Sequence, residues 1–436
     1  MFKVNKISMS DESASATGTP SAAASPRSAM VRLSALQAAN FAGIGIYLPF
    51  MPAWLSAQGL SEEQIGFTLA MGMIVRMFAT QPIASLGDRP WGAARVLLLA
   101  QLLGAGAYVG LTMLPSPTAV MAAMAVVAVL NAGVIPLGDH LTTAQVKRQP
   151  GLDFARMRLW GSVSFLVMSV LAGVMVSRLG IATLPYALSV CCLFAAAIAM
   201  IAPDVRSKHA SHVNEVPAAA LKPEVLTLLW LVIIASALIN ASHAMLYGFA
   251  TIHWRSLGIS DSTIGVLWAV SVVSEIGMLW WFGRTASASF GNAVVFLAIA
   301  GIGAMLRFAA MPFATTLPAI IMVQALHAIS FGAQLLGVMA ILAMLSPGGR
   351  GASIQGRLSA VNACLMGAAT LLSGVLYARL GAMGFLAMLP IAVAGLATLA
   401  AAYLRGKRVL LDTGTGGALG LDGDARRSNV RLEPEP

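Results

Sequence analysis

Residues 261–284 read DSTIGVLWAVSVVSEIGMLWWFGR, and this stretch decides the fold. Between Asp261 and Arg284 the segment is apolar except for one carboxylate, Glu275. About 20 apolar residues in a helix are long enough to cross the hydrocarbon core of a bilayer. A carboxylate near the middle of such a helix is costly to insert, so it usually faces a water-filled cavity or a polar partner and serves transport. The alternative is a protonated Glu275, or one held in a structural ion pair between helices.

The composition extends this interpretation to the whole chain. Of its 436 residues, 58% are hydrophobic and 10% are charged, whereas soluble domains contain about 25% charged residues. We therefore expect an all-α polytopic membrane protein whose partners are the lipid bilayer and a small-molecule substrate. The net charge of +10 reflects membrane orientation rather than nucleic-acid binding. The three cysteines lie in apolar segments, and metal-spaced clusters, a G-x-S-x-G motif and a phosphate loop are absent, so no cofactor, metal or enzyme activity is expected.

Charges, prolines and glycines separate the apolar segments of spanning length. Twelve such segments are predicted, near 33–57, 63–86, 92–113, 118–146, 157–177, 182–202, 225–253, 262–283, 289–311, 316–345, 354–378 and 382–404. The polar stretch 203–224 is the predicted cytoplasmic linker between two six-helix halves, 31–202 and 225–404. The composition of residues 1–30 and 405–436 predicts disordered cytoplasmic tails.

The basic residues predict the orientation of these helices. With the N-terminus inside, 22 of the 27 Lys and Arg residues fall in cytoplasmic segments and three in outside loops. The rule that cytoplasmic loops are enriched in Lys and Arg then places both termini inside. We expect a multi-pass protein of a bacterial-type inner membrane that functions as a monomer.

The two halves resemble each other in sequence. LSEEQIG at 60–66 matches ISDSTIG at 259–265, and LAGVMVSRLG at 171–180 matches LSGVLYARLG at 372–381. Two matches at nearly one offset indicate a duplication, and therefore two pseudo-symmetric halves. The same offset aligns Arg76 with Glu275, so we expect these two charges to face each other across a central cavity. Arg76 is either a clamp for an anionic substrate or the ion-pair partner of Glu275.

Twelve spans in two parallel repeats form the pattern of the major facilitator superfamily, and specific motifs narrow the resemblance. The segments GIGIYLPFMPAWLSAQGLSEEQIGFTLA at 43–70 and FARMRLWGSVSF at 154–165 resemble the branch that contains the lactose and phenylpropionate permeases. So do SEIG around Glu275, MLRF around Arg307 and VQALH at 323–327. The resemblance covers about 32–404, and it implies proton-coupled transport.

The resemblance also implies roles for individual residues. Asp139 and Arg158 match a carboxylate and an arginine that contact substrate in that branch, and Glu275 matches a glutamate that binds substrate and belongs to the proton path. Arg307 and His327 match residues that assist proton coupling. Asp139 and Arg158 could instead form a salt bridge at the inner gate. Two positions depart from the branch: Ser330 replaces the glutamate that carries the proton, and Phe165 replaces a tryptophan that stacks on a sugar ring.

These expectations combine into one predicted transport cycle. A small aromatic carboxylate similar to 3-phenylpropionate is taken up with protons by alternating access between the halves. Arg76 holds the carboxylate and Phe165 lies against the ring, with Gln324 and Arg158 as further substrate ligands. Glu275, His327, Arg307 and Asp139 couple the cycle to protons. The alternatives are a proton symporter of sugars or nucleosides and an efflux antiporter of drugs or metabolites.

Overall fold

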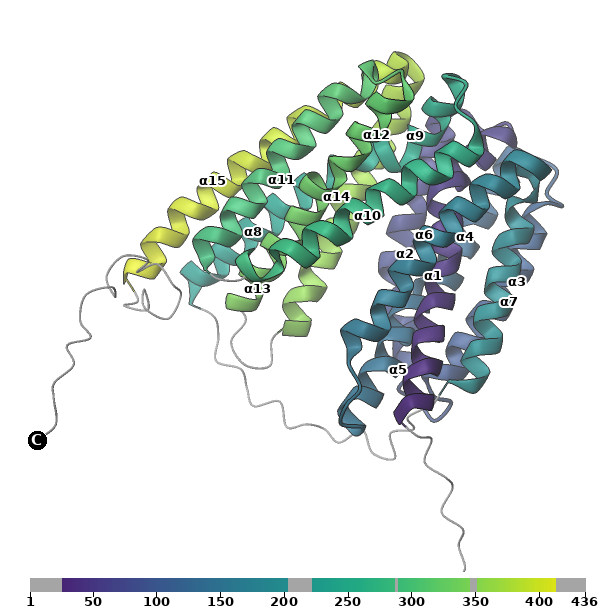
Figure 1. The fold of residues 1–436 in the computed structure, drawn as a ribbon, viewed down its shortest axis with the longest axis horizontal. Helices are drawn as coiled ribbons and strands as arrows, with labels where there is room; N and C mark the ends of the chain where they lie inside the picture. The colour runs from purple at the N-terminus through teal and green to yellow at the C-terminus, as the bar shows by residue number, and fades with distance from the viewer. Residues whose placement is uncertain (1–25, 203–221, 287–288, 346–350, 413–436) are drawn as a thin grey trace, which may run out of the picture.

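The computed structural model describes residues 26–202, 222–286, 289–345 and 351–412, and each regular element in these ranges is a helix. Figure 1 shows two groups of helices side by side, purple to teal and green to yellow. The first half contains α1 (Pro26–Ala57), α2 (Glu62–Leu86), α3 (Ala93–Leu111), α4 (Pro117–Ala132), α5 (Val134–Arg148), α6 (Phe154–Leu179), η1 (Ile181–Thr183) and α7 (Leu184–Ile201). The second half contains α8 (Pro223–Ala241), α9 (Ala244–Ser256), α10 (Asp261–Ala286), α11 (Phe290–Ala310), η2 (Met311–Phe313), α12 (Leu317–Ala325), η3 (Ala328–Gly332), α13 (Ala333–Met344), α14 (Gly351–Leu380), η4 (Gly381–Met388) and α15 (Leu389–Asp412).

The helices are long and apolar enough to cross a membrane twelve times within the described ranges. Eleven helical stretches qualify by length and hydropathy, and the last of them, Ser353–Arg408, is 56 residues long. That stretch contains two helices, α14 and α15, joined by the short turn η4. The described part of the chain therefore has the number of spans predicted from the sequence.

The ends of the bundle differ slightly from the predicted segments. The helix α1 already begins at Pro26, and α15 continues to Asp412, so a few residues assigned to the tails are helical. The remaining tail residues, 1–25 and 413–436, and most of the linker, 203–221, lie outside the described residues. Figure 1 shows the described ends of α1 and α15 at the same end of the bundle.

Three of the twelve crossings are interrupted in mid-membrane. One breaks at Gly133 between α4 and α5, another at Ser242 and His243 between α8 and α9, and the third contains the π-helical turn η3 between α12 and α13. Interrupted helices leave backbone groups without their usual partners, which a membrane tolerates only where protein or a wet cavity surrounds them. These breaks therefore locate the polar interior of the bundle.

The repeated sequence motifs form matching turns in the two halves. Gly59 and Gly258, which precede the first pair of motifs, have φ values of 83° and 79°. Gly180 and Gly381, at the end of the second pair, have φ values of 85° and 53°. A positive φ is accessible to glycine at little cost, so the duplicated sequence preserves the turns that connect equivalent helices.

The same motifs also supply two close crossings between the halves. A Cβ atom on Gly66 of α2 would lie 2.7 Å from Cα of Gly374 on α14, and one on Gly173 of α6 would lie 3.1 Å from Cα of Gly265 on α10. Gly66 corresponds to Gly265, and Gly173 to Gly374, so the two crossings are equivalent under the repeat. Small residues allow membrane helices to approach this closely.

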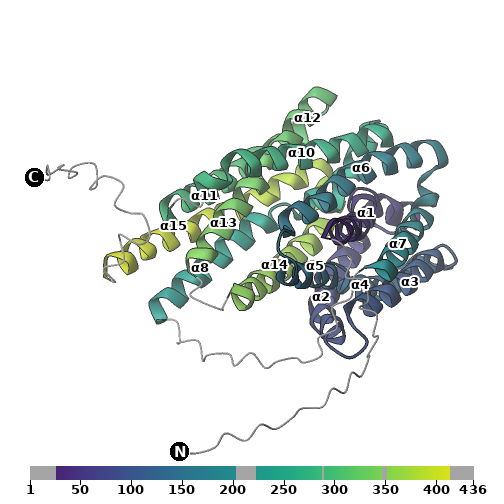
Figure 2. The same cartoon turned by 60° about the horizontal axis from the view of Figure 1, so that its bottom comes forward.

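These crossings lie at the end of the bundle opposite to the chain ends. In Figure 1 the two groups of helices meet near α9 and α12 and diverge toward the ends of α1 and α15, and Figure 2 shows α6 beside α10 where the groups meet. The largest buried apolar cluster joins both halves, with Phe50 and Trp54 from α1 and Phe249 and Trp254 from α9. The bundle is thus closed by packing at this end.

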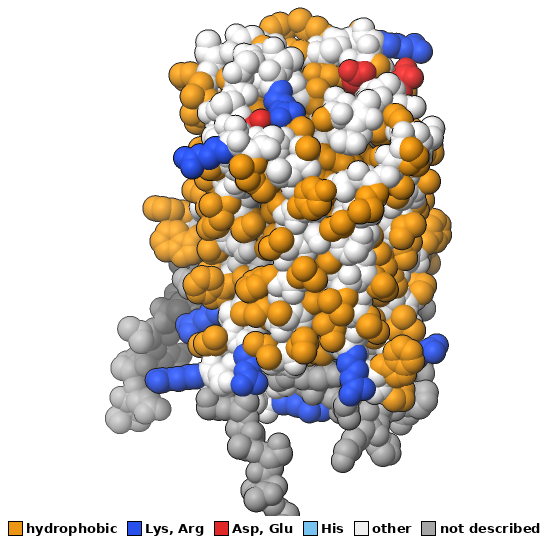
Figure 3. All heavy atoms as spheres, turned by 90° about the vertical axis from the view of Figure 1, so that its right-hand side faces the viewer, with side chains coloured by type: hydrophobic (Ala, Val, Ile, Leu, Met, Phe, Trp, Pro, Cys, Tyr) orange, Lys and Arg blue, Asp and Glu red, His pale blue; other side chains and the backbone are white. Residues whose placement is uncertain are grey.

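The outer surface carries a broad belt of apolar side chains. Figure 3 shows this belt between two rims that both carry Lys and Arg side chains. Large apolar side chains on the outside include Trp280 and Trp281, with relative exposures of 79% and 73%. A soluble protein rarely exposes so much contiguous apolar surface, whereas a bilayer covers it.

Candidate functional site

A group of buried polar side chains lies inside the second half, with Arg307 of α11 at its centre. The guanidinium of Arg307 donates to Oε1 of Gln324 at 2.5 Å and to Nδ1 of His327 at 2.7 Å, and it reaches Oγ of Ser330 at 3.4 Å. Arg307, Gln324 and Ser330 are fully buried. Among the described residues, no carboxylate forms a salt bridge with Arg307, so its charge is held by neutral acceptors.

The hydrogen bonds assign the protons of both histidines in this group. An arginine only donates, so Nδ1 of His327 accepts and the proton of the neutral ring is on Nε2. The hydroxyl of Ser330 accepts from Arg307 and can donate its own proton to Nε2 of His243, 3.0 Å away. Nδ1 of His243 then donates to the carbonyl of Ile239 at 3.2 Å. Both histidines are neutral in this arrangement, and Nε of Arg307 is the one buried donor of the guanidinium without a hydrogen-bond partner among the described residues.

His327 links this group to Glu275. Its Nε2 lies 3.7 Å from Oε2 of Glu275, longer than a hydrogen bond and close enough that a small movement would form one. The side chain of Glu275 has a relative exposure of 19%, and that of His327 has one of 8%. Glu275 is therefore the more accessible end of a path that continues through His327 to Arg307.

The π-helical turn η3 brings His327 and Ser330 to the same guanidinium. His327 precedes the turn, and Ser330 lies within it. Gly303 of α11 makes this approach possible, because a Cβ there would lie 3.2 Å from the backbone nitrogen of Ser330 and closer still to Ile329. Single π-helical turns are frequent at functional sites, since they redirect side chains without ending the helix.

Arg158 and Asp139 connect the first half to this region less directly. The guanidinium of Arg158 lies 3.8 Å from the ring centroid of Phe41, and it interacts electrostatically with both Asp139 and Glu275. Asp139 accepts a 2.9 Å hydrogen bond from Gln37, and no salt bridge joins it to Arg158. The attraction between Arg158 and Glu275 crosses from α6 to α10, and so acts between the halves.

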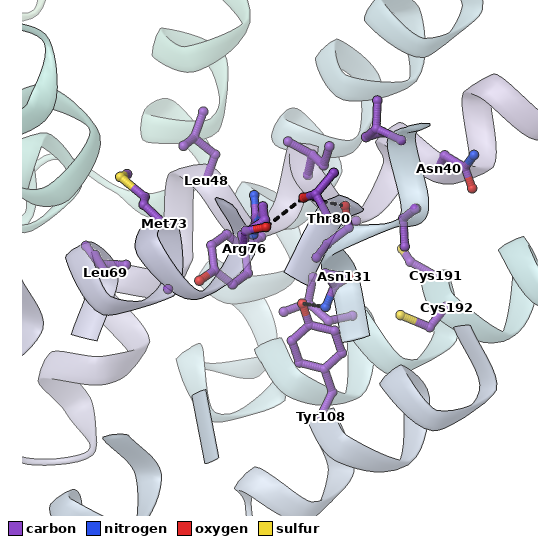
Figure 4. Close-up of a pocket in the computed structure, with 18 of the residues that line it drawn as sticks. Asn40, Leu48, Leu69, Met73, Arg76, Thr80, Tyr108, Asn131, Cys191 and Cys192 are labelled. Carbon is purple, nitrogen blue, oxygen red and sulfur yellow. Dashed lines mark hydrogen bonds between the residues drawn. The ribbon is translucent and has the colours of Figure 1, made fainter. Parts of the chain in front are cut away.

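Arg76 lines a separate cavity of about 370 Å³, formed mainly by the first half. Figure 4 shows Arg76 near Thr80, Asn131 and Tyr108. Asn131 donates to the hydroxyl of Tyr108 at 3.4 Å, and Thr80 bonds to the carbonyl of Arg76 rather than to its guanidinium. Among the described residues nothing forms a hydrogen bond or ion pair with the Arg76 guanidinium, which leaves its donors free for an anion.

The second half also contributes to this cavity, through Tyr247, Gly248 and Thr370. Arg76 also lines a second cavity of about 550 Å³, which lies between α2, α8 and α14. Glu275 lines neither of the two cavities, so its place is beside His327 rather than directly opposite Arg76. Phe165 lines neither of them, and its backbone packs against Gly45 of α1.

The structure brings together Glu275, His327, Arg307 and Gln324, and it keeps Arg76 in a distinct cavity. Sequence reasoning did not include His243 among the site residues, although this histidine closes the hydrogen-bonded group through Ser330. It also passed over Asn40, Gln101 and Tyr108, which line the cavity of Arg76. Their polar side chains in otherwise apolar helices were the available signal. The described residues contain no cluster of three or more His, Cys, Asp or Glu that could hold a metal ion.

Comparison with known proteins agrees with this architecture. Over 382 residues the chain is 31% identical to a protein of Escherichia coli (strain K12) described as "Probable 3-phenylpropionic acid transporter", covering 85% of this chain and 95% of the relative. Among solved structures, the nucleoside transporter NupG superposes with a TM-score of 0.70 at 16% identity, covering 87% of this chain and 99% of the other. A bacterial homologue of the lysosomal transporter Spinster, described as inward-facing and unoccupied, gives a TM-score of 0.65 at 14% identity, with 88% and 98% covered.

The structural similarities, at these low identities, establish the fold. Family membership follows from the sequence, because residues 30–387 match the MFS_1 like family. The chain therefore belongs to the MFS_1 like family of major facilitator superfamily transporters, and it is a transporter rather than an enzyme.

Proposed function

We propose that this protein is a proton symporter that takes up a small aromatic carboxylate similar to 3-phenylpropionate. The observation that carries the proposal is the Arg76 guanidinium, which has no partner among the described residues and faces a cavity with aromatic and aliphatic walls. A volume of about 370 Å³ lies in the range of pockets for small ligands, and a guanidinium matches the planar geometry of a carboxylate. The description of the E. coli relative supports the same substrate class.

Proton coupling in this proposal begins at Glu275. Deprotonated Glu275 attracts Arg158 of the first half, and protonation removes that attraction. A proton on Glu275 therefore changes an interaction between the halves. An interaction that differs in strength between two conformations can shift the equilibrium between them. His327 directs its Nε2 proton toward Glu275, and Arg307 fixes that tautomer.

The transport cycle follows from the closed and divergent ends of the bundle. The glycine crossings and the apolar cluster close one end, and the cavities beside Arg76 lie below them. We assign the divergent end to the cytoplasm of a bacterial cell with an inner membrane, because the predicted cytoplasmic segments contain most of the Lys and Arg residues. One chain supplies both halves, so a monomer is sufficient for alternating access.

Binding to the purified full-length protein tests the substrate class. Aryl-alkanoic acids should raise its unfolding temperature in a concentration-dependent manner, because a ligand that binds only the folded state stabilises it. Sugars, nucleosides and the uncharged amides of the same acids should have little effect. Stabilisation by sugars or nucleosides, with none by aryl acids, would overturn the proposed substrate class.

A further inference from the structure

The cavity of Arg76 contains a second polar region, formed by two side-chain amides. Asn40 of α1 and Gln101 of α3 both line the cavity, and each residue is only 4% exposed. The Asn40 amide is buried, and neither its nitrogen nor its oxygen has a hydrogen-bond partner. Gln101 also makes no side-chain hydrogen bond to any described residue. We call Asn40 and Gln101 the amide subsite.

Leaving a buried amide unpaired is unfavourable, so most such groups in native proteins have a partner. The fold makes room for Asn40, because Gly138 of α5 has no side chain and leaves the space that the Asn40 amide nitrogen occupies. Apolar side chains of the same size would fill this place without the cost. The Asn40 amide has almost no accessible surface and no partner, so we expect its side chain to turn toward the cavity and receive its hydrogen bonds from a ligand.

The amide subsite lies at a different level of the cavity from Arg76. Asn40 precedes Tyr47 on α1 by seven residues, and Gln101 precedes Tyr108 on α3 by seven residues, so each amide is two helical turns from a phenol. Both phenols interact electrostatically with Arg76. At 1.5 Å per residue the two levels are about 10 Å apart along the helices. Figure 4 likewise shows Asn40 to one side of Arg76, away from Leu69.

Apolar side chains occupy the cavity wall between the two levels. Ile44 lies one turn beyond Asn40 on α1, and Leu188 of α7 also lines the cavity. A separation of about 10 Å is comparable with the length of a phenyl ring plus a three-carbon acid chain. A ligand whose carboxylate binds Arg76 would thus place its ring beside these apolar residues and the far edge of the ring at the amide subsite.

We propose that the amide subsite selects aromatic acids with a polar substituent, such as a hydroxyl, on the ring edge opposite the acid chain. This inference rests on the proposed function, since it requires the carboxylate to bind at Arg76. A ring hydroxyl both donates and accepts, so it can satisfy the oxygen of one amide and the nitrogen of another. An unsubstituted ring would leave Asn40 unpaired, and sites with unpaired polar groups discriminate against such ligands.

The test compares two probes, 3-phenylpropionate and 3-(4-hydroxyphenyl)propionate, by calorimetric titration of the purified full-length protein. The wild type should bind the hydroxylated acid about tenfold more tightly, the equivalent of one well-formed hydrogen bond. Asn40→Leu and Gln101→Leu should each reduce that ratio toward one. Gln355→Leu, at an exposed position outside the cavity, should leave the ratio unchanged.

The unfolding temperature of the ligand-free variants distinguishes ligand recognition from a structural role. Replacing an unpaired amide by an apolar side chain of similar shape is neutral or stabilising, so Asn40→Leu should unfold at the wild-type temperature or above. A clear destabilisation would contradict the inference, as would equal affinities of the wild type for both acids. If neither acid binds the wild type at all, the proposed function fails as well.

Discussion

Arg307 donates a 2.7 Å hydrogen bond to Nδ1 of His327, and both side chains are buried in the second half of the bundle. A second proton on His327 would place a donor against a donor, so protonation of this ring requires Arg307 to move. Arg307 also contacts Gln324 and Ser330, and through Ser330 it is linked to His243. In the proposed cycle, a proton that arrives by way of Glu275 can therefore rearrange contacts on four elements, α10, α11, α12 and η3, and at His243 between α8 and α9.

Ser330→Ala tests the hydrogen-bonded group around Arg307. The substitution leaves Nε2 of His243 without its donor, so we expect a loss of stability of about 1–3 kcal/mol and reduced uptake. Thermal unfolding and transport in proteoliposomes measure the two effects. Ser373→Ala is the matched control, because that buried hydroxyl bonds to the carbonyl of Ala369 on its own helix. Equal effects of the two substitutions would contradict a special role for Ser330.

The glycine crossings predict a second result. Leucine at both Gly66 and Gly265 should force α2 from α14 and α10 from α6, since a Cβ at either position has no room. The closed end should then open, and a maleimide added from that side should label an engineered cysteine in the cavity much faster. Gly110→Leu is the control, because nothing lies within 4 Å of a Cβ at that position. Unchanged labelling in the double variant would show that these crossings do not close the bundle.

Thr251 forms another link between the halves near the closed end. Its hydroxyl bonds to the carbonyl of Pro49 on α1 at 2.5 Å and accepts from Nε1 of Trp268 at 3.1 Å. Thr251→Val removes both bonds, so we expect the same labelling assay to show a several-fold increase, smaller than that of the glycine double variant. Thr398→Val should have no effect, because that exposed hydroxyl bonds only within its helix. A labelling rate of Thr251→Val equal to that of the wild type would show that Thr251 does not help to close this end of the bundle.

Arg76→Gln tests the carboxylate site. Hydrogen bonds to a charged group contribute about 1.5–3 kcal/mol, so the affinity for an aryl-alkanoic acid should fall roughly 10- to 100-fold. The amide of the same acid should bind the variant and the wild type alike. Arg156→Gln, at a position whose side chain is 81% exposed, serves as the control for loss of one positive charge. Undiminished affinity for the acid in Arg76→Gln would exclude Arg76 as the anion site.

The sequence was sufficient to predict the spans and the two halves, because hydropathy along the chain and the repeated motifs can be read from the order of residues itself. The repeat around Gly66 and Gly265 was visible, but its role as a helix crossing depends on packing between α2 and α14. Glu275, Arg307 and His327 were recognisable as buried ionisable residues. The direction of their side chains was not, because it depends on the π-helical turn before Ala333.

The cavity of Arg76 was harder to predict. Asn40 is far in sequence from Gln101 and Tyr108, and the three residues line one cavity only because α1 and α3 both border it in the folded bundle. Phe165 was expected at the substrate because of its position in a motif. Which face of a helix lines a cavity depends on the helices packed around it. Here the backbone of Phe165 packs against Gly45 of α1.

In the proposed cycle Glu275 carries the proton that drives uptake. Glu275→Gln retains the shape of the side chain and removes its charge and titration, so it resembles a permanently protonated state. In proteoliposomes this variant should lose accumulation of aryl-alkanoic acid driven by a proton gradient while retaining exchange of labelled for unlabelled acid. Full gradient-driven accumulation by Glu275→Gln would contradict the account.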